Sequence, residues 1–164
     1  MQTLSRGRVR NLHPFGTLLA ATARRLLPDF LERREHGFQD GGCAIMARAL
    51  AIWSQGRMTL GSITLASDPV RVQHVVAIAD GVLLDSDGVA TERDMILKME
   101  RIEMRPGCIL APGFEPTRTP GIPWDETESS HLADGLHSML PDPATTPWRN
   151  VAFPSGTTGV GQWN

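Results

Sequence analysis

Cys43 is the residue whose sequence position best suits it for chemistry. It follows Gly41-Gly42 and begins the run CAIMARALAIW, which ends at Trp53 and carries Arg48 as its only charge. This run predicts a buried helix, and the N-terminus of a helix places positive potential and free backbone N–H groups beside the sulfur. Both effects favour the thiolate, the nucleophilic form of cysteine. The alternative interpretation is a buried structural cysteine.

Two strand-like runs follow the expected helix. They cover residues 58–66 and 70–79, and His74 lies in the second run. Asp80-Gly81 is a two-residue hairpin signal, so the chain should return antiparallel through residues 82–85. The sequence therefore predicts a helix that carries the cysteine, followed by strands that carry the histidine.

Counting residues across this hairpin predicts that three side chains share one face of the ribbon: His74, Asp85 and Asp87. A carboxylate beside a histidine fixes its tautomer and stabilises the imidazolium that forms when the ring takes a thiol proton. Direct pairing places Asp87 opposite His74 and Asp85 opposite Val76. The residues alone therefore leave Asp85 and Asp87 as competing orienting groups.

A candidate for stabilising an oxyanion lies just before the cysteine. Gln39 stands four residues ahead of Cys43, and its side-chain amide could donate to a developing negative charge. The backbone N–H groups of Cys43 and Asp40 are alternative donors. Gln39 is equally well interpreted as a solvated loop residue.

Composition limits the classes of partner and compartment. The 164 residues fit one domain, and 16 Lys and Arg against 18 Asp and Glu give a net charge of -2, which does not favour nucleic acid as a partner. No apolar run reaches the roughly 18–20 residues of a membrane span, so no membrane partner is expected. Cys43 and Cys108 are interpreted as reduced thiols, which predicts a cytoplasmic protein, with secretion as an effector as the alternative.

Three zones differ in composition. Residues 1–37 are basic and helical in pattern, and Pro28 should divide them into two helices. Nine of the 12 prolines lie at or after Pro106, which predicts a mostly loop extension with one short helix near residues 131–140. We therefore expect a catalytic domain with an N-terminal helical region over residues 1–105. Residues 106–164 should form an extension that packs on or lines the same domain.

The remaining histidine pattern does not indicate a metal site. His131 and His137 lie six residues apart, which is the wrong spacing for one helical face. No metal and no cofactor is expected.

The order of a helix-borne Cys, a strand-borne His and an Asp on the next strand resembles the papain-like superfamily, in particular its transglutaminase-like and arylamine acetyltransferase-like branches. The resemblance covers roughly residues 38–88, through the motifs QDGGC and HVVAIADGVLLDSDG. It implies an α+β fold in which a buried helix carrying Cys43 packs on an antiparallel sheet. It further implies Cys43 as nucleophile, His74 as general base and Asp85 as orienting residue, and Gln39 lies close to the position of the glutamine that papain-like proteases use for the oxyanion.

These expectations define two functions. The first is a cysteine-dependent hydrolase or acyltransferase acting on an amide, peptide or ester bond through a thioester, with a protein, a peptide or a small amide as substrate. This class includes peptidases, amidases, deamidases and transferases. The alternative is a non-catalytic papain-like module that binds a protein partner through the extension after Pro106.

Overall fold

The computed structural model describes residues 14–116, 119 and 121–145, which form four helices and five strands of one sheet. Every pair of neighbouring strands is antiparallel, and the strand order is β4-β3-β2-β1-β5. The mixed fold with an antiparallel sheet is therefore confirmed. The elements are α1 (Pro14–Arg33), α2 (Cys43–Trp53), β1 (Thr59–Leu65), β2 (Asp68–Ala79), β3 (Val82–Asp85), β4 (Gly88–Ala90), α3 (Glu92–Glu103), β5 (Cys108–Pro112) and α4 (Glu126–Met139).

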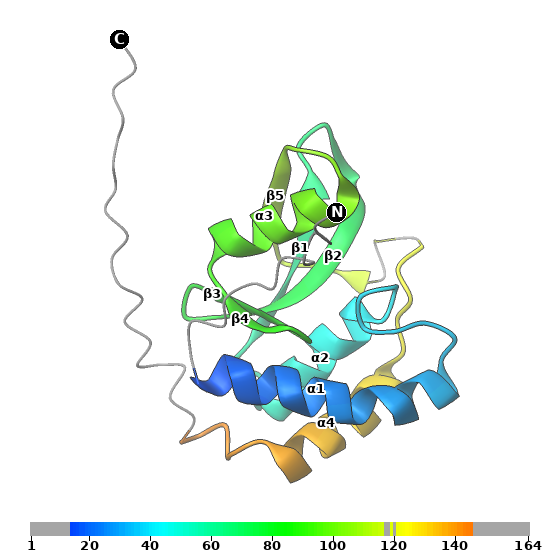
Figure 1. Cartoon of the computed structure of the whole chain (residues 1–164), viewed down its shortest axis with the longest axis vertical. Coiled ribbons are helices and arrows are strands. Elements are labelled where there is room, and N and C mark those ends of the chain that lie inside the picture. Colours follow the sequence, from blue (N-terminus) through cyan, green and yellow to red (C-terminus); the bar gives the residue numbers. More distant parts are fainter. Residues whose placement is uncertain (1–13, 117–118, 120, 146–164) are drawn as a thin grey trace, which may run out of the picture.

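The sheet lies between two helical layers. Helices α1, α2 and α4 gather on one face, and α3 lies on the other (Figure 1). Alternate residues of β2 divide between the two layers, since Ala77 and Ala79 pack with α1, α2 and α4, whereas Val76 packs with Met95 and Met99 of α3. In the described part of the chain, no helix is both long and apolar enough to cross a membrane.

The hairpin between β2 and β3 has the predicted register. Ala79 pairs with Val82, and two further pairs extend the ladder to Ala77 and Leu84. Asp80 and Gly81 both have positive φ, 48° and 81°, as the commonest two-residue hairpin turn requires. This register determines which side chains of β2 and β3 can meet.

The predicted break at Pro28 is wrong, because α1 runs unbroken through it. A proline inside a helix removes one hydrogen bond to the carbonyl four residues earlier, here that of Arg24. Both Pro28 and Arg24 are exposed, so water can satisfy this carbonyl. Leu26 and Phe30 are buried in the core on either side of the proline, and this packing holds the helix together.

After residue 105, the described part of the chain contains one helix, α4, near the expected position, and a strand, β5, that the sequence analysis did not predict. Strand β5 pairs with β1 along its whole length and forms one edge of the sheet. Helix α4, at 14 residues, packs closely against α2. The described part of this region therefore belongs to the same core as the first 105 residues, and residues 146–164, which include much of the expected extension, lie outside the described part.

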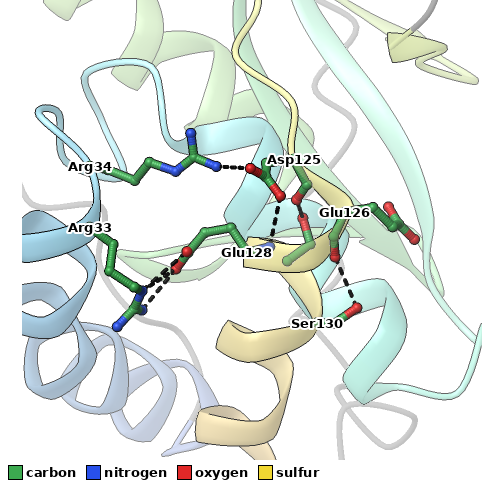
Figure 2. A network of polar contacts seen from close by, with 7 residues as sticks. Arg33, Arg34, Asp125, Glu126, Glu128 and Ser130 are labelled. Carbon is green, nitrogen blue, oxygen red and sulfur yellow. Dashed lines mark hydrogen bonds and ion pairs between the residues drawn. The ribbon is translucent and has the colours of Figure 1, made fainter.

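Ion pairs fasten the end of α1 to the beginning of α4 (Figure 2). Arg33 holds the Glu128 carboxylate through its Nε and a terminal nitrogen, at 2.9 and 2.8 Å, and Arg34 pairs with Asp125. Asp125 also caps α4 by accepting the N–H of Glu128. These contacts fix the start of α4 beside the loop that leads from α1 to Cys43.

Gly42 is required by close packing at the entrance to α2. A Cβ atom built there would lie 2.8 Å from the Gly37 carbonyl oxygen and 2.9 Å from the Phe30 ring. We expect Gly42→Ala to lower the free energy of unfolding by about 1–3 kcal/mol, because a backbone atom must move. Gly37→Ala is the control, since its Cβ would make an ordinary 3.7 Å contact with Leu27. Urea denaturation of the two variants checks this, and equal losses would contradict it.

Candidate active site

Cys43 is the first residue of α2, as the sequence predicts. The N-cap residue, Gly42, has no side chain to occupy the N–H groups of the first turn, and Gly41 turns the chain into the helix with φ of 104°. Most helices use Ser, Thr, Asp or Asn at the cap. Because no capping side chain occupies them, the N–H groups of the first turn can donate to the Cys43 sulfur or to a molecule bound beside it.

The thiol of Cys43 is paired with His74. Burial alone would raise the pKa of Cys43, but the hydrogen bond and charge of His74, together with the backbone N–H groups of Val75 and Ala44, bring that pKa below its usual value. Ala44 belongs to the first turn of α2, so the helix N-terminus contributes directly. The site favours a thiolate beside an imidazolium.

His74 lies beside an irregularity in the sheet. Ile63 of β1 pairs with His74, but Thr64 pairs with Val72, so Gln73 is an extra residue in β2. Such bulges turn a strand locally and re-aim its side chains. The bulge and the strand together present His74 to Cys43 on one side and to β3 on the other.

The His74 ring is held by Asp85. Its Nε2 lies 2.9 Å from Asp85 Oδ2, and both side chains are buried. Burial by itself would lower the pKa of His74, but the hydrogen bond to Asp85 and the interactions with Cys43 raise it to about 9. For Asp85, burial opposes ionisation, and the hydrogen bond from His74 and the charge of Lys98 hold the pKa well below its usual range.

The structure places Asp85, rather than Asp87, against His74. Strand β3 ends at Asp85, and Ser86 and Asp87 form the turn into β4, where Gly88 pairs with Asp85. The Asp87 side chain is 54% exposed and pairs with Lys98. Its backbone N–H donates to Asp85 Oδ1 at 2.8 Å, so Asp87 supports the Asp85 carboxylate.

Lys98 contacts both Asp85 and Asp87, and the sequence analysis did not predict these contacts. Its Nζ lies 2.5 Å from Asp85 Oδ2 and 2.8 Å from Asp87 Oδ2. Burial would lower the pKa of Lys98, but the charges of the two aspartates raise it above its usual value. A signal existed in the sequence, because Met95, Lys98 and Met99 have the spacing of one helical face, and all three are buried.

The side chain of Gln39 forms a hydrogen bond with Ser86. Its Nε2 donates to Ser86 Oγ at 2.7 Å, next to Asp85 in the chain. One amide hydrogen remains for another acceptor. The backbone N–H of Asp40 is bound to the Gly37 carbonyl at 3.1 Å, so Asp40 is not a free oxyanion donor.

Apolar side chains surround Cys43. The buried part of the cluster comprises Ala44, Ala47 and Val75. Partly buried side chains complete it: Leu60, Val72, Phe114, Ile122 and Trp124. Trp124 precedes Asp125 and packs against Phe114 with ring centroids 6.2 Å apart, so the ion pairs at the start of α4 also position this ring. Apolar surroundings strengthen the electrostatic interactions of the Cys43–His74 pair.

Cys108 has a different environment. It is buried on β5 with α3, and its pKa is raised by burial and by the charges of Glu100 and Glu103. Within residues 14–116, 119 and 121–145, no group of three or more His, Cys, Asp or Glu side chains is arranged to hold a metal ion.

The opposite pKa shifts of the two thiols predict different reactivity. At pH 7 iodoacetamide should alkylate Cys43 at least about tenfold faster than Cys108, because only the thiolate reacts and a lowered pKa increases its fraction. His74→Gln should slow the labelling of Cys43 and leave that of Cys108 unchanged. Peptide mass spectrometry over a time course measures both rates, and equal rates in the unmodified chain would contradict the prediction.

Comparison with known proteins gives no further information on Cys43, His74 and Asp85. No protein-family model matches the chain, and no curated protein or solved structure matches it.

Proposed function

We propose that this protein is a cysteine-dependent hydrolase or acyltransferase that acts on an amide, peptide or ester bond. The observation that carries the proposal is the continuous chain of contacts from Cys43, at the start of α2, through His74 to the buried Asp85. Each link supplies one requirement of thiol catalysis: a nucleophile, a proton acceptor beside it and a carboxylate that orients the acceptor.

The lowered pKa of Cys43 and the raised pKa of His74 favour a thiolate–imidazolium pair as the starting state of the reaction. The Cys43 thiolate attacks the carbonyl carbon, and the carbonyl π electrons move to its oxygen beside the N–H groups at the start of α2. As the oxyanion collapses, the bond to the leaving group breaks, and the His74 imidazolium protonates the departing amine or alcohol. Neutral His74 then takes a proton from water or an amine, which attacks the thioester and releases Cys43 as thiolate.

The papain-like relationship is part of the same proposal. It is supported by the chain order of Cys, His and Asp and by the position of α2 against β2. The rival function, a non-catalytic module that binds a protein through residues after Pro106, becomes the conclusion if the site forms no acyl intermediate.

An activated ester tests the proposal without knowledge of the natural substrate. With p-nitrophenyl acetate we expect a burst of p-nitrophenolate and an acetyl group on Cys43, detected by intact-protein and peptide mass spectrometry. Decay of the adduct in buffer alone gives the hydrolysis rate, and faster decay with a primary amine would identify transfer. If Cys43 is not acetylated above the level of Cys108, the chain is not an acyl-transfer enzyme.

A further inference from the structure

Lys98 brings a buried charge to the triad from a helix that carries none of its members. The side chain is 6% exposed and comes from α3, on the face of the sheet opposite α2. Burying an ammonium group costs free energy unless it is paired. A leucine or methionine between Met95 and Met99 would fill an apolar helix face without that cost. The charge of Lys98 therefore needs an explanation beyond packing.

The Asp85 carboxylate is held at both oxygens. Oδ2 is shared by His74 Nε2 at 2.9 Å and Lys98 Nζ at 2.5 Å. Oδ1 accepts the Asp87 N–H at 2.8 Å. Two donors on one oxygen and a third on the other leave the carboxylate a single orientation, with Oδ2 toward the imidazole. Lys98 supplies one of these donors and also a full positive charge.

We propose that Lys98 is a positioning residue of the triad, whose ammonium group holds Asp85 Oδ2 against His74 and offsets part of the carboxylate charge that His74 experiences. The proposal rests on the proposed function only in treating the three residues as a catalytic triad.

Offsetting the Asp85 charge makes it easier for His74 to release the proton that it has accepted. A buried carboxylate paired with the histidine alone would hold the imidazolium proton tightly, yet His74 must give this proton to the leaving group. The charged and titratable groups in contact here come from every neighbouring element: Cys43 of α2, His74 of β2, Asp85 and Asp87 at the end of β3, and Lys98 of α3. Among them, Lys98 is the positive charge that opposes the pull of Asp85 on His74.

Removing this charge should change how His74 titrates. In Lys98→Met we expect the His74 midpoint to rise by on the order of one pH unit, because the Asp85 charge is no longer offset. Asp85→Asn should lower the midpoint, and Lys98→Arg, which keeps the charge, should stay close to the unmodified protein. NMR titration of the imidazole signals, with His74 identified from a His74→Gln sample, measures the midpoints without a substrate.

A purely structural tether would give a different result. If Lys98→Met folds and the His74 midpoint is unchanged or falls, the proposal is overturned. If Lys98→Met does not fold, the double variant Lys98→Met/Asp87→Asn replaces it, because it removes one charge of each sign and should still raise the midpoint. If neither folds while Lys98→Arg does, Lys98 is structural only and the proposal fails. None of these outcomes depends on acetylation of Cys43, so failure of the proposed function is recognised separately.

Discussion

Replacing Cys43 with alanine is expected to abolish acetyl-enzyme formation and to reduce p-nitrophenolate release by a factor of about 10³ or more. The sulfur is the atom that bonds to the acyl group, and the backbone N–H groups of Val75 and Ala44 beside it cannot take its place. Burst amplitude in stopped-flow absorbance and the mass of the protein measure the two effects. Cys43→Ser should be nearly as inactive, because His74 does not deprotonate an alcohol as readily as a thiol.

The control for this experiment is Cys108→Ala. Cys108 is buried between β5 and α3, away from α2, which carries Cys43, so its removal should leave the burst intact at a small loss of stability. An acetyl adduct that persists in Cys43→Ala, or that disappears in Cys108→Ala while the fold is retained, would assign the nucleophile elsewhere.

Asp85→Asn is expected to reduce the rate of acyl transfer by a factor of about 10³ to 10⁴. An amide in place of the carboxylate cannot stabilise the imidazolium, and its NH2 group can present a donor where His74 needs an acceptor. The midpoint of thermal unfolding should also fall, since the buried Lys98 ammonium would lose its ion pair with the buried Asp85 carboxylate and keep only the pair with the half-exposed Asp87. Burst kinetics and circular dichroism on the same sample separate the catalytic loss from the structural one.

Asp80→Asn provides the same chemical change at the tip of the same hairpin. Asp80 is exposed, and asparagine tolerates its positive φ, so activity should remain within about twofold of the unmodified chain. Asp87→Asn tests the rival third member. A greater loss in Asp87→Asn than in Asp85→Asn would show that Asp87 orients His74.

The parts of the fold that depend on local signals could be predicted. Asp80-Gly81 predicted a two-residue turn, and the register of β2 against β3 is the one that this turn implies. The apolar run after Gly41-Gly42 located α2 to the residue. Thr91 caps α3 through an equally local contact, because the Asp94 N–H, three residues on, donates to its Oγ1 at 3.1 Å. In each case, neighbouring residues determine the structure.

The parts that depend on distant contacts could not be predicted. Strand β5 is five residues long and is stabilised by pairing with β1, more than 40 positions earlier. Pro28 should end a helix by local rules, but the packing of Leu26 and Phe30 overrides them. Which aspartate contacts His74 depends on where β3 ends: the strand ends at Asp85, and Asp87 lies in the turn that follows. The contacts of Lys98 could not be predicted, because they depend on α3 packing over that turn.

The bare start of α2 has a thermodynamic consequence. A serine or aspartate N-cap typically adds about 1 kcal/mol to the stability of a helix. At Gly42 this gain is forgone, and the 2.8 Å distance from a built Cβ to the Gly37 oxygen means that no single substitution there can recover it without moving the backbone. An aspartate cap would also place a second negative charge beside the sulfur. The tight loop before Cys43 therefore lowers the stability of α2, because it excludes a capping side chain, and it favours ionisation of the Cys43 thiol.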